Sequence, residues 1–249
     1  MSAEATVSAP PKAPIWGELR YSAELARLLA DDQLWRRRPA DAQPVMLIPG
    51  FMAGDASLAV LRGWLRRRGH PVAMSGLLAN VDCAERILAR LEKQLLTLAE
   101  ETSRPVVLIG QSRGGALARA LAVREPERVA GLVMLGSPVR DALAVSRPVL
   151  RTVRWMARLG DLRVPGLFST ACRDGVCCAV FREDLVAPLA PGISVVSIHS
   201  RSDAIVDWRA CLEPHGEQVE IDSSHCGMSV HPGVYRVLDR VLSAESPAR

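Results

Sequence analysis

The sequence predicts an α/β fold built on a mostly parallel, doubly wound sheet. The chain has 249 residues, 49% of them hydrophobic, which is enough to bury a sizeable core. Aromatic residues make up only 4%, so the core must consist of Leu, Val, Ile and Ala, as in sheets covered by helices on both faces. Short apolar segments alternate with segments whose apolar residues recur at helical spacing, the pattern of parallel strands joined by right-handed crossovers.

Each element is predicted from its period and its breaks. Pro49-Gly50 ends the first strand, the break at 69–71 separates a helix from the next strand, and Pro232 begins the last helix. The predicted strands are 44–51, 71–78, 105–110, 129–138, 193–200 and 217–221. The predicted helices are 16–35, 58–65, 87–98, 114–125, 149–159 and 232–241. No internal repeat is visible.

These elements divide the chain into a tail, an extension, a core and an insertion. Residues 1–14 are rich in Ala, Pro and Ser without periodicity, so we expect a disordered tail. Residues 15–43 form an N-terminal helical extension. The α/β core comprises 44–138 and 191–243. Between them, 139–190 contain no convincing strand, and a compact domain seldom holds so long a plain loop, so we expect a helical cap there.

Charge and hydropathy exclude several classes of protein. The net charge is +4, and its two arginine runs, 36–38 and 66–68, are short and lie at predicted helix ends, where cations are favoured. No aromatic or glycine pattern of a nucleic-acid module accompanies them, so we expect no nucleic-acid partner. No apolar run reaches the roughly 18 residues of a membrane span, which leaves weak association with anionic lipid surfaces open. The N-terminus lacks a secretory signal, which predicts a cytoplasmic location.

The six cysteines are most simply reduced thiols in a cytoplasmic chain. Cys172, Cys177 and Cys178 form a C-x4-C-C cluster. Without a second matched cluster this spacing is a weak metal signal, and a local disulfide is the other alternative. We therefore predict no metal site.

A candidate nucleophile lies at the turn between the strand 105–110 and the helix 114–125. Gly110-Gln111-Ser112-Arg113-Gly114 fits G-x-S-x-G with a strand before it and a helix after it, the context in which this motif presents a serine. The alternative is a serine that only caps the helix. Phosphate binding does not fit, because neither G-x-G-x-x-G nor a Lys-Ser/Thr pair is present.

A serine needs a base, and the base needs a carboxylate to orient it. We choose His225 in "EIDSSHCGM", because enzymes with this motif order their residues Ser, acid, His along the chain. The other histidines are His70, His199, His215 and His231. Asp203 is the preferred acid because it follows the strand 193–200 directly. Asp207 has the position of a helix N-cap, and Asp222 that of a turn residue.

The loop 49–52 follows the first predicted strand and can supply a second hydrogen-bond donor to an oxyanion. We assign the two donors to the backbone N–H groups of Phe51 and Arg113, with Met52 as the alternative to Phe51.

Taken together, these motifs resemble the α/β-hydrolase superfamily, and within it the bacterial lipase and esterase-like branch. The segments that carry the resemblance are 49–51, 110–115, 135–138, 200–206 and 224–228. The resemblance implies a sheet of about eight strands, a serine nucleophile and no cofactor. Two positions depart from the family pattern. The loop begins Pro49-Gly50 where many relatives have His-Gly, and Arg113 stands where Leu, Met or His is common.

The sequence therefore predicts a serine hydrolase that cleaves carboxylic esters through an acyl-enzyme, with Ser112, His225 and Asp203 as its triad. Its expected partner is a small acyl ester, lipid esters included, and its oligomeric state is not indicated. The same triad also serves acyl transfer and the hydrolysis of thioesters or amides. A binding protein that kept the fold without catalysis is the remaining alternative.

Overall fold

The computed structural model describes residues 11, 13–36, 42–173 and 175–243. Residues 1–10 and 12 of the predicted tail, and 37–41 of the predicted extension, lie outside the described residues.

The described residues form one sheet of six strands, all parallel, in the order β2-β1-β3-β4-β5-β6. The strands are β1 (Val45–Ile48), β2 (Val72–Met74), β3 (Val106–Gln111), β4 (Val129–Leu135), β5 (Ser194–His199) and β6 (Glu217–Glu220). Each lies within or overlaps one predicted strand, and the fold class is confirmed. The expected count of about eight is wrong, because the described residues contain six strands, and the described segment 15–35 ahead of β1 has a helical period and forms helices.

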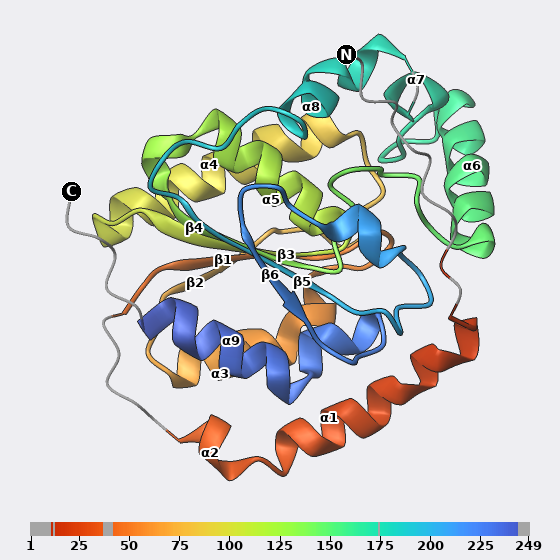
Figure 1. Cartoon of the computed structure of the whole chain (residues 1–249). Coiled ribbons are helices and arrows are strands. Elements are labelled where there is room, and N and C mark those ends of the chain that lie inside the picture. The colour runs from red at the N-terminus through yellow and green to blue at the C-terminus, as the bar shows by residue number, and fades with distance from the viewer. Residues whose placement is uncertain (1–10, 12, 37–41, 174, 244–249) are drawn as a thin grey trace.

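Helices cover both faces of this sheet (Figure 1). On one face lie α4 (Ala84–Thr102) and α5 (Arg113–Arg124), and on the other α3 (Ala59–Arg67) and α9 (Pro232–Ser243). Alternate side chains along a strand point to opposite faces of the sheet and enter separate hydrophobic cores, one on each face. In β1, Met46 and Ile48 are buried with α4 and α5, whereas Val45 and Leu47 are buried with α3 and α9.

The strand order reverses at β1 and β3. The crossover through α3 takes the chain from β1 outward to β2, and α5 takes it from β3 the other way to β4. The loops after β1 and β3 therefore diverge from neighbouring strand ends, which opens a crevice at this point of a doubly wound sheet. The loop 49–52 and Ser112 both lie there.

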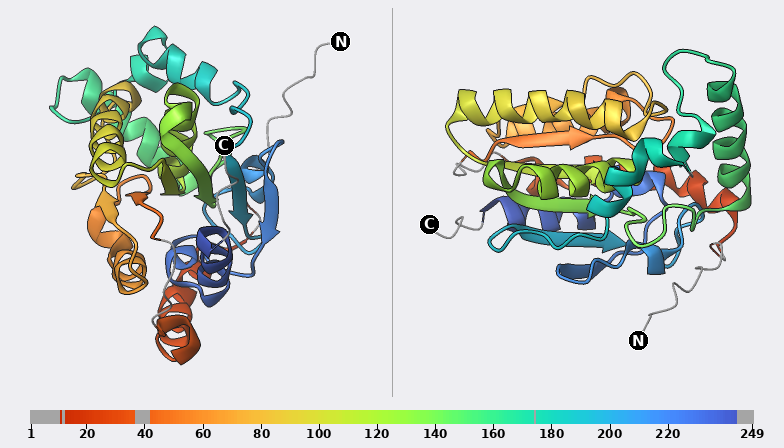
Figure 2. Two further views of the ribbon diagram at one scale, coloured as in Figure 1. Left: turned by 90° about the vertical axis from the view of Figure 1, so that its left-hand side faces the viewer. Right: turned by 90° about the horizontal axis from the view of Figure 1, so that it is seen from above.

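Helices occupy the segment between β4 and β5, beside one end of the sheet (Figure 2). They are α6 (Arg147–Asp161), α7 (Thr170–Arg173), η4 (Val176–Cys178) and α8 (Ala179–Asp184). Arg119 of α5 fastens the end of this segment, because its guanidinium donates to the backbone carbonyls of Asp184 and Ala187 and pairs with buried Glu213. Arg124 also pairs with Asp184.

The N-terminal helices η1 (Ile15–Arg20), α1 (Tyr21–Leu29) and α2 (Asp32–Trp35) lie beyond α9, on the same side of the sheet (Figure 1). Leu28 is fully buried in the core of that side. α1 also packs against η6 (Cys226–Val230), the short helix that follows His225. The remaining short helices are η2 (Asp55–Leu58), η3 (Pro126–Arg128) and η5 (Trp208–Cys211). Within the described residues, no helix combines the length and apolar character needed to cross a membrane.

Candidate active site

Ser112 lies at the turn between β3 and α5 with a strained backbone. Its φ of +53° and ψ of −123° are rare for a residue with a side chain, and its N–H donates to the Leu135 carbonyl at 2.8 Å. Among the described residues, its hydroxyl forms no capping hydrogen bond with α5. The capping alternative is therefore not supported, and the turn holds the hydroxyl at the edge of the sheet.

Glycines allow the segments around this turn to approach closely. A methyl group at Gly114 would overlap the carbonyl groups of Ile48 and Pro49, so α5 packs directly on the end of β1. A Cβ atom at Gly50 would lie 3.2 Å from the Ser112 Cβ. The loop after β1 therefore passes immediately beside the serine.

Asp203 and His225 come together as a buried pair. Asp203 Oδ2 lies 2.6 Å from His225 Nδ1, while Oδ1 accepts from the N–H groups of Ile205 and Val206 at 2.7 and 2.8 Å. These bonds fix the carboxylate, which in turn fixes the ring. Burial disfavours the imidazolium, but the charge and hydrogen bond of Asp203, with the charge of Glu18, outweigh it and raise the pKa of His225.

The competing carboxylates are engaged elsewhere. Asp207 Oδ1 accepts from the Arg209 N–H at 2.9 Å and caps η5. Asp222 is largely exposed and pairs with Arg20. Two of the competing histidines have partners of their own: His70 Nδ1 lies 3.0 Å from the Gln43 carbonyl oxygen, and the His199 ring stacks on Trp208.

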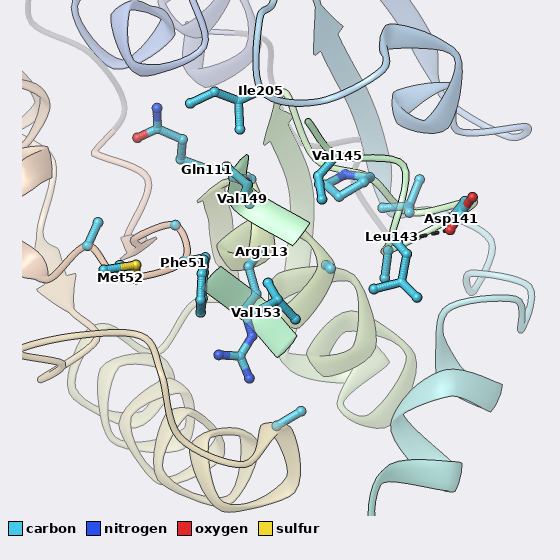
Figure 3. A pocket seen from close by; sticks show the side chains of 18 of the residues that line it. Phe51, Met52, Gln111, Arg113, Asp141, Leu143, Val145, Val149, Val153 and Ile205 are labelled. Carbon is cyan, nitrogen blue, oxygen red and sulfur yellow. Dashed lines mark hydrogen bonds between the residues drawn. The ribbon is translucent and has the colours of Figure 1, made fainter. Parts of the chain in front are cut away.

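His225 and Ser112 both line one cavity of about 790 Å³, a volume typical of small-molecule sites. Apolar side chains from several segments dominate its wall: Phe51, Leu143, Val145, Val149, Val153 and Ile205. Figure 3 shows Phe51 and Met52 on one side of the cavity and Leu143 and Val145 on the other.

The comparisons with known proteins concern the fold that carries this site. A family model described as serine aminopeptidase, S33, matches residues 67–186. The mature lipase BlEst2 of Bacillus licheniformis superposes with a TM-score of 0.62, at 14% identity over 84% of this chain and 95% of that chain. The chain has the α/β-hydrolase fold.

Two other structures with a similar fold have different activities in their names. A soluble variant of the monoglyceride lipase of Saccharomyces cerevisiae has a TM-score of 0.57, at 14% identity over 84% of this chain and 88% of that chain. The thioesterase domain of the curacin biosynthetic pathway has a TM-score of 0.52, at 13% identity over 83% and 92%. At such identities the likeness establishes the fold. A comparison with curated proteins found no match.

Sequence reasoning missed the residues that hold the loop of His225. Glu18 of η1 accepts from the N–H groups of His225 and Cys226 at 3.0 and 2.9 Å, one bond to each carboxylate oxygen. Buried Glu24 of α1 accepts from Ser224 N–H at 2.8 Å and from its hydroxyl at 2.6 Å. No local pattern links these glutamates to a loop near the opposite end of the chain.

Asn80 and Gln111 hold the neighbouring loops. Asn80 is fully buried, and its side-chain amide donates to the Pro49 carbonyl at 2.8 Å. The Asn80 backbone carbonyl accepts from Met52 N–H at 3.4 Å. Gln111 donates to the His225 carbonyl at 3.0 Å. Of these two residues, only Gln111 could have been singled out from the sequence, because it occupies the first variable position of the G-x-S-x-G motif.

The Arg113 side chain holds the loop ahead of α4. Its guanidinium donates to the carbonyls of Asn80 and Asp82 at 2.9 and 2.7 Å and lies 5.5 Å from the Phe168 ring. Burial lowers its pKa to about 10, which leaves it cationic at neutral pH. Arg113, which departs from the family pattern, therefore connects the turn at Ser112 to the segments that contain Asn80, Asp82 and Phe168.

One group of side chains has the composition of a metal site. The sulfur atoms of Cys83, Cys172, Cys177 and Cys178 all lie within 4.8 Å of one another, and all four cysteines are free thiols. The sequence shows the last three as a cluster but predicts no metal site, and Cys83, which precedes α4, was not expected to join them.

Proposed function

We propose that this protein is a serine hydrolase that cleaves carboxylic esters. The observation that carries the proposal is the buried Asp203–His225 pair at 2.6 Å, in one apolar cavity with a serine whose φ is +53°. Nucleophilic attack by a serine hydroxyl on an acyl group requires an accessible serine, a histidine that takes its proton and a carboxylate that holds the histidine. The site contains all three residue types.

In this mechanism the Ser112 Oγ attacks the ester carbonyl carbon while His225 Nε2 takes the hydroxyl proton. The tetrahedral oxyanion collapses, the carbon–oxygen bond to the leaving alcohol breaks, and the imidazolium returns the proton to that alcohol. Water then repeats the sequence on the acyl-enzyme and frees the acid. Asp203 keeps Nδ1 protonated and stabilises the imidazolium throughout.

We assign the oxyanion donors to the backbone N–H groups of Arg113 and Phe51. Arg113 is the first residue of α5, where the N–H groups have no partner within the helix and the dipole is positive. Met52 N–H is directed at the Asn80 carbonyl, which supports Phe51 as the donor from the other loop. Losing one such donor typically costs about 3 kcal/mol of transition-state stabilisation.

The cavity wall supports an acyl group of hydrocarbon character. We propose that residues 139–190 act as the cap over the site, because α6 contributes Val149 and Val153 to the same wall as Phe51. A hydrocarbon chain placed there loses its contact with water without leaving polar groups unpaired.

Amide cleavage is a second candidate, since the matching family model is described as a serine aminopeptidase. An aminopeptidase must pair the ammonium group of its substrate with an anion. Within the described residues, Asp141 is the one carboxylate that lines the cavity, and one of its oxygens already accepts from Leu143 N–H at 2.9 Å. The site therefore favours an uncharged ester over a peptide N-terminus.

The test is hydrolysis of p-nitrophenyl esters of graded acyl length by the wild type, Ser112→Ala and Ser243→Ala. Ser243 is exposed at the end of α9 and serves as the matched control. We expect Ser112→Ala to lose the activity and Ser243→Ala to keep it. Equal rates for wild type and Ser112→Ala would refute the assignment.

A parallel panel of thioesters, aminoacyl amides and added alcohol acceptors distinguishes the alternative reactions. Labelling with a fluorophosphonate probe, located by peptide mass spectrometry, tests for a catalytic serine independently of the substrate. Folded protein that resists the probe at Ser112 would favour a non-catalytic binding protein.

A further inference from the structure

The four-cysteine cluster joins two parts of the chain that are far apart in sequence. Cys83 is the N-cap residue of α4, whereas Cys172 lies in α7 and Cys177 and Cys178 in η4. The closest sulfur pairs are Cys83 with Cys178 at 3.5 Å, Cys83 with Cys177 at 3.6 Å, and Cys172 with Cys177 at 3.5 Å. The sulfurs therefore form a compact group of four, not two separate pairs.

This spacing matches a single tetrahedral metal ion. Zinc bound at about 2.3 Å by four thiolates places the sulfur atoms ~3.8 Å apart. Three sulfur pairs lie 3.5 to 3.6 Å apart, and all four sulfurs lie within 4.8 Å of one another. A polynuclear iron–sulfur cluster interposes its own iron and sulfide between the cysteines and needs them further apart. We propose that Cys83, Cys172, Cys177 and Cys178 bind one zinc ion.

Positively charged groups near the sulfur atoms would stabilise the negative charge of a zinc ion bound by four thiolates. Each thiol releases its proton on binding, so zinc with four thiolates carries two negative charges. The guanidinium of Arg113 interacts favourably with negative charge on Cys83 and Cys178, and that of Arg86 with negative charge on Cys83 and Cys172. Cys83 also stands at the positive end of the 19-residue helix α4.

The segment that carries three of the ligands is held in shape by its own hydrogen bonds. Ser169 contacts Cys172 twice, because its Oγ lies 3.4 Å from the Sγ and accepts from the N–H at 3.4 Å. Arg182 of α8 donates to the carbonyls of Arg173, the last residue of α7, and Gly175, both of which lie between Cys172 and Cys177 in the sequence. Such outer contacts orient metal ligands before the ion arrives.

The site would be structural, because four protein ligands leave no open position for water or substrate. Cys172 and Cys178 also line the cavity, so the ion would fasten one wall of the pocket to the start of α4. Arg113, which follows the nucleophile, would then bridge the metal centre and the turn that presents Ser112. This inference does not depend on the proposed ester hydrolysis.

The direct test measures zinc in the full-length protein purified under reducing conditions from zinc-supplemented cells, by inductively coupled plasma mass spectrometry. We expect about one zinc ion per chain. Cys83→Ser and Cys177→Ser should lose most of it. Cys226→Ser removes an exposed thiol outside the cluster and should retain the full content. Zinc content that is absent in wild type, or equal in all variants, would overturn the proposal.

A second measurement uses the wild type alone, in case a cysteine variant does not fold. Zinc is removed with a chelator under reducing conditions, and the protein is titrated with Co²⁺. We expect the visible bands of tetrahedral cobalt and an intense thiolate-to-cobalt charge-transfer band, saturating at one ion per chain and reversed by zinc. Reduced protein that develops no such spectrum, or a disulfide within the cluster that persists under these conditions, would overturn the proposal.

Discussion

Replacing Glu18 with glutamine tests how the N-terminal helices act on the histidine. The Glu18 carboxylate accepts one bond from His225 N–H and one from Cys226 N–H, at 3.0 and 2.9 Å. Glutamine has a single acceptor oxygen, so one of these N–H groups would face an amide NH₂ instead. The histidine loop would lose one charge-assisted bond and the charge itself.

The size of the effect follows from those two bonds. A hydrogen bond to a charged group contributes about 1.5–3 kcal/mol, and the lower value applies because Glu18 is only half-buried. If the productive conformation of the His225 loop is destabilised by ~1.4 kcal/mol, the rate falls about tenfold. We expect kcat/KM to fall about tenfold in Glu18→Gln, and about a hundredfold in Glu18→Ala, which loses both bonds.

The pH profile separates positioning of the histidine from general damage. The Glu18 charge helps to raise the pKa of His225, so its removal lowers that pKa. Because the base must be neutral to accept the serine proton, the acid limb of kcat/KM moves to lower pH in the variant. A purely structural defect would lower the rate at every pH without moving the limb.

The assay is the pH dependence of p-nitrophenyl ester hydrolysis by wild type, Glu18→Gln and Glu100→Gln. Glu100 is exposed on α4, away from the cavity, and is the matched control. An unchanged rate and acid limb in Glu18→Gln, or a limb that moves to higher pH, would refute the reasoning.

Two further predictions concern the Asp203–His225 pair and the turn between β3 and α5. Asp203→Asn keeps the shape of the side chain but favours the wrong tautomer of His225, and we expect kcat to fall roughly 10³- to 10⁴-fold in the same assay. Gly114→Ala forces a methyl group against the carbonyls of Ile48 and Pro49, and we expect the free energy of unfolding in urea to fall by about 3 kcal/mol or more.

Matched substitutions control both experiments. Asp207→Asn alters the cap of η5 and should leave kcat within a few-fold of wild type. Gly63 lies on the exposed side of α3 with open space around it, so Gly63→Ala should stabilise by about 0.5–1 kcal/mol. An active Asp203→Asn, or a Gly114→Ala as stable as Gly63→Ala, would contradict these predictions.

The sequence predicted features that rest on local physical chemistry. The period of apolar residues identified all six strands of the sheet, because a buried parallel strand and a helix with one apolar face leave different patterns along the chain. The G-x-S-x-G segment likewise predicted a strand-to-helix turn, since its glycines permit the close approach that Gly114 makes to β1. The count of eight strands came from family resemblance alone, and it was wrong.

Only the tertiary structure decided which distant segments meet. Helices η1 and α1 bring Glu18 and Glu24 onto the loop of His225, and the segment after β4 brings three cysteines onto Cys83. These contacts depend on how helices pack over the sheet and its loops, and no period along the chain encodes that packing. The sequence by itself determined the fold class, the turn at Ser112 and the candidate acid and base. The residues that hold them, and the cluster of four sulfurs beside them, emerged only when the chain was folded.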